Sequence, residues 1–489
     1  MILALDIGTS SVRAALYDSA GNRLDATFVK NERTLEFTGE GGAEVDAETG
    51  LKQVEQAIDE VLAKAGAAAD RIEFVAASCF WHSLVGVDES GEALTPVLTW
   101  ADRRSADFVP VLQEKFDENE THNRTGCRFH PSYWTAKLLW FKDREPDVFG
   151  KAVKWLSFSD FLALRFFGEA ATSVSQASGT GIFNIRECVW DSELTGFLNL
   201  SPDNLPRVAS DAETFVLNEK YAARWQQLKN AKWFPGIGDG AANNVGANCA
   251  RREKAALMIG TSGAMRVIYE GDPPADLPPG LWCYRLDRKR VIVGGALSDG
   301  GGLYGWLKNS FQYAGTDDEL ETKIAAMTPD SHGLTVLPFW SGERSTNWNA
   351  KASGAILGLT PHTSPIQIMQ AVLEGVAYRF AAIFEQLCAG VCPLEEIIAS
   401  GGALRESPVW TQIIADALGK TLTLPDTREA SSRGAVLLVL ETTGKIENIA
   451  ELKTDEGQIF TPDAAKHEIY KLAKRRQEDL YASVMKTKA

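Results

Sequence analysis

The chain has 489 residues, of which 45% are hydrophobic and 24% charged, a composition typical of a globular protein rather than a disordered or fibrous one. Because a single hydrophobic core stops growing near roughly 250–300 residues, we expect at least two domains. The formal net charge of −15 argues against a broad basic face for nucleic acid. No apolar run reaches a membrane-spanning length, and the seven scattered cysteines form no disulfide framework, so the sequence predicts a cytoplasmic protein without a membrane partner.

The first eighteen residues predict a β-hairpin with a hydroxyl-rich turn. Two apolar runs, 2–7 and 11–17, flank a Gly-Thr-Ser-Ser turn. Further along, 74–80 has the pattern of a strand, and 47–66 has the apolar periodicity of a helix that ends at Gly66. This early mixture of strands and helices indicates an α/β fold.

The opening pattern recurs once in the second half of the chain. The Gly-Thr-Ser of residues 8–10 aligns with the Gly-Thr-Ser of residues 260–262, and identities on either side keep the same offset. A constant offset indicates two halves built on one hairpin. We therefore predict two similar domains, 1–245 and 246–489, which face each other across a cleft.

Both turns have the composition of a phosphate cradle, because small residues let backbone N–H groups approach an oxyanion and hydroxyls add donors. No Walker loop occurs, and the first turn, in DIGTSS, lacks the G-x-G-x-x-G fingerprint. Asp6 in the first copy corresponds to Met258 in the second, so only the first copy carries a carboxylate for a cation. The alternative is that Asp6 bonds the amides of its own turn. The pairing of the two turns favours the cation.

A second carboxylate, Asp239, stands between two glycines in PGIGDGAANNVGAN, before small residues that can form a helix. The density of Gly and Ala leaves room for a large ligand beside this carboxylate. We interpret Asp239 as a general base that accepts the proton of an attacking hydroxyl during phosphoryl transfer. The alternative is a helix N-cap.

Aromatic residues stand beside polar ones at two predicted strand ends, Trp81-His82 and Trp100-Ala-Asp102. Such a surface suits a ligand with apolar C–H faces and many hydroxyls. Taken alone, however, His82 fits an interior histidine better.

Two later segments add candidates. A predicted strand runs into Gly401-Gly402, which can admit an adenine or ribose or form a simple tight turn. The loop 337–360 is rich in Trp, Gly and charge, and its neighbouring Glu343 and Arg344 fit a simple ion pair.

Together these segments resemble the FGGY family of carbohydrate kinases, within the actin/hexokinase superfamily. The resemblance covers most of the chain and is carried by LALDIGTSSVRAALYD, WADRRS, GIGDGAANNVGAN, LMIGTSGA, SGERSTNWNAKASGAILGLTPHTSPIQIMQAVLEGVAYRF and ASGGALRESPVW. SCFWHSLVGVDESGEALTPVLTWADRRS and TGCRFHP are most similar to gluconate kinases. The resemblance implies two ribonuclease-H-like domains around a central cleft, ATP and Mg²⁺ as cofactors, and phosphorylation of a terminal sugar hydroxyl.

Carried over by position, the resemblance implies a role for each candidate residue. Asp239 is the catalytic base and shares the Mg²⁺ with Asp6. The residues implied to contact the nucleotide and its phosphates are Thr9, Ser10, Arg13, Gly260, Thr261, Gly301 and Gly402. The residues implied to contact the sugar are Trp81, His82, Trp100, Asp102 and His130.

The chain also departs from the family pattern, which leaves the sugar open. Trp81 stands where gluconate kinases usually have Met, and Thr346 replaces the proline of GERxPxWN. GGALSDGG places Asp299 near the cleft, where a carboxylate facing the substrate would disfavour a sugar acid. Arg103 or Arg104 could pair with a gluconate carboxylate, or both could be surface charges.

We expect an ATP-dependent kinase whose small-molecule substrate is D-gluconate, converted to 6-phosphogluconate. The alternatives are a ketopentose kinase for xylulose or ribulose, a non-catalytic ATP- or sugar-binding sensor, and an actin-like filament protein. Asp6 and Asp239 argue against the sensor, and the aromatic residues argue against the filament. The sequence leaves the oligomeric state open, a homodimer included.

Overall fold

The computed structural model describes residues 1–311 and 315–485. The strands of its two large sheets are β1 (Ile2–Ile7), β2 (Ser11–Tyr17), β3 (Val29–Glu32), β6 (Phe74–Cys79), β14 (Lys232–Trp233), β15 (Ile237–Gly238), β16 (Lys254–Ile259), β17 (Gly263–Glu270), β18 (Trp282–Arg285), β19 (Arg290–Leu297), β22 (Glu396–Ser400), β23 (Leu422–Pro425) and β24 (Gly457–Phe460). Short strands form small side sheets: β4 (Glu36–Phe37), β5 (Ala43–Val45), β7 (Val85–Val87), β8 (Val97–Leu98), β9 (Lys154–Leu156), β10 (Ala171–Thr172), β11 (Phe183–Asn184), β12 (Val189–Trp190), β13 (Arg207–Val208), β20 (Thr335–Leu337) and β21 (Ala355–Leu357).

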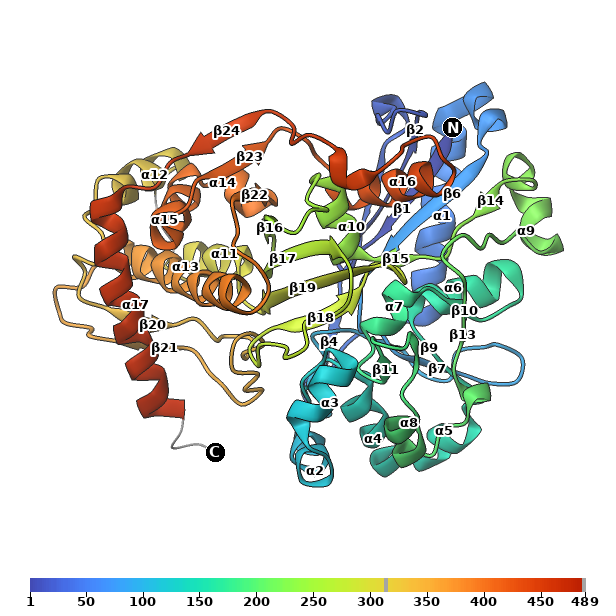
Figure 1. The fold of residues 1–489 in the computed structure, drawn as a ribbon, viewed down its shortest axis with the longest axis horizontal. Helices are drawn as coiled ribbons and strands as arrows, with labels where there is room; N and C mark the ends of the chain where they lie inside the picture. The colour runs from blue at the N-terminus through green and yellow to red at the C-terminus, as the bar shows by residue number, and fades with distance from the viewer. Residues whose placement is uncertain (312–314, 486–489) are drawn as a thin grey trace.

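Helices surround the sheets (Figure 1). Those of the first half are α1 (Ala47–Ala65), α2 (Val109–Lys115), α3 (Glu118–Thr125), α4 (Trp134–Arg144), α5 (Pro146–Lys151), α6 (Phe158–Phe167), α7 (Val174–Ser178), α8 (Ser192–Leu198), α9 (Glu219–Arg224) and α10 (Asp239–Gly246). Those of the second half are α11 (Gly301–Ser310), α12 (Asp317–Ala325), α13 (Pro365–Gly390), α14 (Gly402–Glu406), α15 (Pro408–Leu418), α16 (Ala430–Thr442) and α17 (Ala464–Met485).

The two large sheets share one topology. The first has the order β14-β6-β1-β2-β3, with β15 also on β6, and the second has the order β18-β19-β17-β16-β22-β23-β24. In each, the opening hairpin is antiparallel and its first strand runs parallel to the next strand inward, β6 or β22. The chain therefore contains the predicted pair of ribonuclease-H-like domains.

The repeat seen in the sequence is the repeat of these hairpins, with a shift of register. The first turn holds four residues, because Ile7 pairs with Val12, whereas the second holds three, because Ile259 pairs with Gly263. A constant sequence offset therefore aligns the first strands but misplaces the pairing of the second strands by one residue.

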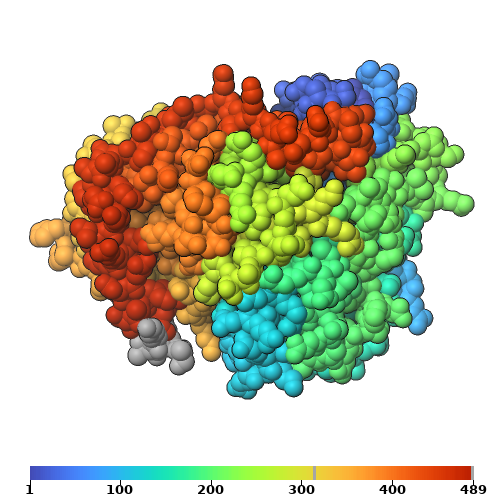
Figure 2. All heavy atoms as spheres, in the orientation of Figure 1, coloured from blue at the N-terminus to red at the C-terminus, as the bar shows by residue number. Residues whose placement is uncertain are grey.

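The two halves exchange helices at their interface. α16 comes from the C-terminal half of the chain but packs on β1, β2 and β6 of the first sheet, while α10 packs on β16 and β17 of the second. Figure 2 shows the same contact on the surface, where the orange-red segment that includes α16 lies against the blue N-terminal segment. A boundary near residue 245 therefore separates two halves of the sequence, but each half contributes a helix that packs on the sheet of the other.

Glycines allow the two exchanged helices to touch through their backbones. A Cβ on Gly246 would lie 1.8 Å from the carbonyl oxygen of Ala430, and one on Gly434 would lie 1.8 Å from that of Ala242. No side chain fits at either position. A buried apolar cluster that includes Ala4 of β1 and Ile268 of β17 completes the joint between the sheets.

The C-terminal segment forms a long helix, α17, one side of which is buried. Tyr470, Ala473 and Gln477 are buried against the second half, where α17 packs on α13 and α15. Near its end, Tyr481 donates a hydrogen bond to Glu343. Among the described residues, none of the helices combines the length and apolar character of a membrane span.

Candidate active site

Asp239 is the first residue of α10, directly after β15 of the first sheet. Its side chain is half-buried, and Oδ1 accepts a hydrogen bond of 2.8 Å from the amide of Gly240. Burial raises the pKa of Asp239 to about 6, against the opposing effect of Arg266. The N-cap position belongs to Gly238, so Asp239 is not the cap of α10. A carboxyl with this pKa is ionised at neutral pH and can accept a proton.

Asp6 lies near the end of β1, close enough to Asp239 for its charge to contribute to the raised pKa there. Its Oδ1 accepts a hydrogen bond of 2.7 Å from Ser78, and its Oδ2 lies 3.2 Å from Nη1 of Arg13. Side chains thus engage both oxygens, so the alternative that Asp6 bonds its own turn amides is wrong.

Glu429 is a third acidic residue at this place, and sequence reasoning missed it. Its Oε2 lies 3.3 Å from Nε of Arg13, and burial raises its pKa, opposed by Arg13. It precedes α16 with a φ of 57°. No motif surrounds Glu429 in the sequence, because the exchange of α16 onto the first sheet is what brings it to Asp6.

The second turn, at Gly260 and Thr261, packs against the N-terminus of α11. The amide of Gly301 donates to the carbonyl of Gly260 at 2.8 Å, and the amide of Gly302 donates to that of Thr261 at 3.0 Å. A Cβ on Gly301 would lie 2.6 Å both from the oxygen of Gly260 and from the Cβ of Ala403. The structure therefore brings the start of α14 against the second turn.

Gly401 and Gly402, at the start of α14, differ in how closely other atoms approach them. Gly401 has a φ of 102°, and a Cβ there would lie 2.1 Å from the carbonyl oxygen of Ile259, so backbone packing requires glycine. The nearest atom to a Cβ on the exposed Gly402 is Oε1 of Glu406 at 4.0 Å. Gly402 is thus free of packing constraints, which leaves space for a ligand.

The indole of Trp81 fills the space beside Asp239. Cβ atoms built on Gly238, Gly240 and Gly179 would lie 1.8, 2.6 and 2.6 Å from this ring. Its Nε1 donates to the carbonyl of Ser175 at 2.9 Å, and the residue is 5% exposed. Trp81 therefore fixes the backbone on both sides of Asp239.

His82 presents one ring nitrogen as an acceptor. Its Nδ1 bonds to the carbonyl oxygen of Gly179, which can only accept, so Nδ1 carries the proton. Its Nε2 lies 3.4 Å from Nη2 of Arg344. Burial, with Arg344 as a second cause, holds the pKa of His82 well below its ordinary value, so the ring is neutral.

Trp100 is partly exposed, and the guanidinium of Arg344 lies 5.5 Å from its ring centre.

Asp102 and His130 differ from the expectation of direct sugar contacts. Asp102 is 1% exposed and accepts from the amide of Ala43 at 3.0 Å as well as from Arg104. His130 accepts from the amide of Ser132 at Nδ1 and also bonds the backbone of Glu343. Both residues support loops around the site.

The two neighbouring arginines differ in their partners, and only Arg104 departs from both alternatives. Arg104 pairs with Asp102 at 2.7 Å and with Glu44, so it is neither a surface charge nor free for a ligand. Arg103 donates to the carbonyl of Ala350, in the loop that carries Arg344.

Two acidic residues near Arg344 are bonded to other groups of the protein. Glu343 pairs with Arg379 at 2.8 Å, so the expected ion pair between Glu343 and Arg344 does not form. Asp299 accepts from the amide and the hydroxyl of Ser341, both at 2.8 Å. Asp299 is therefore engaged within the protein rather than directed at the substrate.

Sequence reasoning also missed two buried cations. Lys137 on α4 is 0% exposed and donates to the carbonyls of His82 and Thr99 at 2.7 and 2.8 Å, and burial lowers its pKa to about 7. Arg266 on β17 is 7% exposed, and its Nε and Nη1 have no hydrogen-bond partner among the residues that the structure describes. A lone charge within an apolar run, as in TAKLLW and GAMRVIY, is the signal that could have found both.

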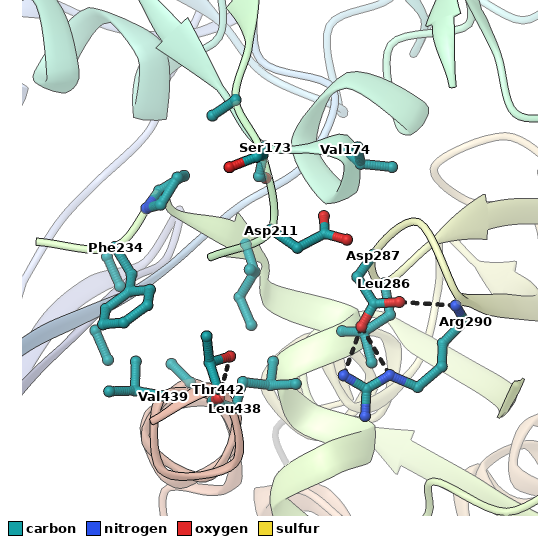
Figure 3. A pocket seen from close by; sticks show the side chains of 17 residues that line it. Ser173, Val174, Asp211, Phe234, Leu286, Asp287, Arg290, Leu438, Val439 and Thr442 are labelled. Atoms are coloured by element: carbon teal, nitrogen blue, oxygen red, sulfur yellow. Dashed lines mark hydrogen bonds and ion pairs between the residues drawn. The ribbon is translucent and has the colours of Figure 1, made fainter. Parts of the chain in front are cut away.

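A separate cavity lies between the two halves, along the segment that leads to Asp239 (Figure 3). Ser173 and Phe234 line it from the first half, and Leu438 lines it from α16. The ion pair between Asp287 and Arg290 closes one side. None of the predicted site residues lines this cavity, so it is distinct from the candidate active site.

Comparison with known proteins agrees with this geometry. Residues 1–246 match the N-terminal domain of the FGGY family of carbohydrate kinases, and residues 255–440 match its C-terminal domain. The chain is 30% identical to a gluconokinase of Bacillus subtilis (strain 168) over 483 residues, 95% of this chain and 93% of that protein. Solved structures of a gluconate kinase and a ligand-bound xylulose kinase, both from Lactobacillus acidophilus, align with TM-scores of 0.88 at 25% identity, covering 99% of this chain and 98% of each. Kinases of this family use ATP and typically a divalent metal. The chain belongs to the FGGY family of carbohydrate kinases.

Proposed function

We propose that this kinase transfers the γ-phosphoryl group of ATP to the terminal hydroxyl of D-gluconate and releases 6-phosphogluconate and ADP. The observation that carries the chemistry is the half-buried Asp239 carboxyl at the start of α10, with a pKa of about 6. The choice of gluconate is supported by the 30% identity with the Bacillus subtilis gluconokinase over almost the whole chain.

In the proposed reaction, Asp239 accepts the proton of the terminal hydroxyl while that oxygen attacks the γ-phosphorus. The bond between the γ-phosphorus and the ADP oxygen breaks, and the proton stays on Asp239 until products leave. Because the transition state of phosphoryl transfer is loose, orienting the hydroxyl matters more than a strong base. Trp81 supplies part of this orientation, since its ring fixes the glycines on either side of Asp239.

The acidic residues fit a Mg²⁺ ion by their donor chemistry. Asp6 and Asp239 would hold it, because carboxylate oxygens are the ligands that this cation prefers. Glu429 and Asp6 both form ion pairs with Arg13, so two carboxylates and one guanidinium lie together here. Mg²⁺ bound here would neutralise charge on the phosphate oxygens.

The two turns support nucleotide binding by their exposure and shape. Ser10 and Thr261 are exposed, so their hydroxyls and the neighbouring amides can face phosphate oxygens. The open space at Gly402 can take the remainder of the nucleotide.

A ketopentose kinase is the second candidate function. The xylulose kinase structure aligns as well as the gluconate kinase structure, with the same TM-score of 0.88, so fold alone does not choose between the substrates. A non-catalytic sensor has no use for Asp239 beside Asp6.

An ADP-release assay with ATP and Mg²⁺ over D-gluconate, D-xylulose, D-ribulose and glycerol tests the proposal. We expect the highest kcat/KM on D-gluconate and a product that 6-phosphogluconate dehydrogenase oxidises. The Asp239→Asn variant controls for contaminating kinases. Preference for a ketopentose would overturn the substrate, and ATP binding without turnover on any acceptor would overturn the activity.

A further inference from the structure

Arg344 is a buried guanidinium without an acidic partner. It is 8% exposed, and its Nε makes no hydrogen bond. Within residues 1–311 and 315–485 it forms no ion pair, and its sequence neighbour Glu343 pairs with Arg379 instead. A buried charge is costly without a counter-charge. The position therefore suits an anion that arrives with a ligand.

His82 and Trp100, the side chains beside Arg344, supply no negative charge. Its Nη2 lies 3.4 Å from Nε2 of the neutral His82, and its guanidinium lies 5.5 Å from the centre of the Trp100 ring. Lys137 and Arg103 add positive charge nearby. The nearby acid Asp299 is already bonded to Ser341. Positively charged side chains therefore gather around Arg344, although the net charge of the whole chain is −15.

A second buried arginine, Arg266, lowers the pKa of Asp239 more strongly than Arg344 does, although both act on this carboxyl. Its Nε would be 3.0 Å from a Cβ on Gly240, the residue after Asp239. Arg344 lies instead with His82 and Trp100, residues predicted to contact the sugar. Arg266 thus lies nearer the proposed base, and Arg344 lies nearer the residues predicted to contact the sugar.

We infer that Arg344 binds the carboxylate of a sugar-acid substrate with its guanidinium fork, while the hydroxyl at the opposite end of the carbon chain lies at Asp239. The inference rests on the proposed function and names the residue that selects its substrate class. A planar fork matches a carboxylate through two parallel hydrogen bonds. Arg344 takes the role that the sequence suggested for Arg103 or Arg104.

The test compares D-gluconate with D-gluconamide, a neutral analogue of nearly the same shape. Calorimetry without ATP gives the affinity of each compound for the wild-type enzyme and for the Arg344→Met and Arg344→Lys variants. We expect wild type to prefer gluconate, and Arg344→Met to lose roughly 10- to 100-fold in gluconate affinity, the range for a hydrogen-bonded charge. Gluconamide affinity should change little, and Arg344→Lys should recover part of the preference.

Arg266→Met is the matched variant, because it removes another buried and unpaired guanidinium. It should change the affinities for gluconate and gluconamide alike. Arg144→Met, at a side chain that is 63% exposed, removes one surface charge and should change neither.

The outcomes separate the two proposals. If wild type phosphorylates no sugar acid, the proposed function fails. If wild type phosphorylates gluconate but Arg344→Met keeps its preference over gluconamide, or if Arg266→Met loses it instead, the inference alone is overturned. Steady-state kinetics with ATP complete the test, because an equal fall in kcat of Arg344→Met on both compounds would assign Arg344 to the transferred phosphoryl group and also overturn the inference.

Discussion

The two hydroxyl-rich turns, residues 8–11 and 260–262, stand on equivalent hairpins yet differ in the charge around them. The strand before the first turn carries Asp6, which engages Arg13 and, through it, Glu429. The strand before the second carries Met258, and backbone amides at the start of α11 bond its turn. Charged side chains from both halves therefore gather near the first turn, whereas backbone hydrogen bonds hold the second.

The largest effect should come from Asp239, the proposed base. Asp239→Asn should lower kcat by about 10²–10⁴, the range for loss of a general base, because the amide cannot accept the hydroxyl proton. Steady-state kinetics with a separate ATP-binding measurement check this. Asp70→Asn, at an exposed carboxylate, is the control. Near-normal turnover in Asp239→Asn would remove Asp239 from the reaction.

Substitutions at equivalent strand positions test the difference between the turns directly. Asp6→Ala should weaken the apparent affinity for Mg²⁺ by at least roughly tenfold, because a carboxylate ligand is lost. Met258→Ala, in the second copy, should leave the Mg²⁺ dependence unchanged. Titration of activity with Mg²⁺ measures both. A similar Mg²⁺ response of both variants would place the metal elsewhere.

The predicted nucleotide contact at Gly402 is tested by adding a methyl group where the protein has space for one. Gly402→Ala should raise KM for ATP by roughly tenfold, the usual effect of one misplaced methyl group in a pocket, and leave KM for the sugar unchanged. Because a Cβ at Gly402 meets no atom closer than 4.0 Å, folding should be unaffected. An unchanged KM for ATP would mean that no nucleotide approaches Gly402.

The smallest effect is the pH dependence set by Asp239. Its pKa is raised from 3.8 to about 6, so kcat/KM should fall as pH drops through 6, roughly tenfold per unit once the base is protonated. A profile that stays flat down to pH 5 would contradict this role.

The same raised pKa affects stability with a defined sign. Between pH 3.8 and about 6 the folded protein holds a proton on Asp239 that the unfolded chain has lost. Its contribution to the free energy of unfolding therefore falls as pH rises through this window. Asp239→Asn should consequently unfold at a higher temperature than wild type at pH 8, and calorimetric scans of both proteins would show this.

Local pattern was enough to predict much of the fold. The helix predicted over 47–66 is α1, with Asp46 as its N-cap and Gly66 at its end. The hairpin at 2–17 and the strand at 74–80 are β1, β2 and β6. These elements follow from periodicity and turn chemistry, which are properties of neighbouring residues.

The site was less accessible to sequence reasoning, because several of its groups meet only in three dimensions. Glu429 reaches Asp6 through the exchange of α16, which no local pattern encodes. Asp102 fits a ligand contact by type, but its pairing with Arg104 and Ala43 depends on how loops pack. Likewise, the partner of Glu343 proved to be Arg379 on α13 rather than its sequence neighbour.

The exchange of α10 and α16 between the two halves affects how the chain folds during its synthesis. The face of the first sheet that α16 covers stays bare until the ribosome has synthesised the chain through Thr442. Residues 1–246, although they match a complete family domain, therefore emerge with an apolar surface that their own sequence cannot bury. Nascent chains of this protein should engage chaperones over this interval, and the two halves expressed as separate polypeptides should become soluble only together.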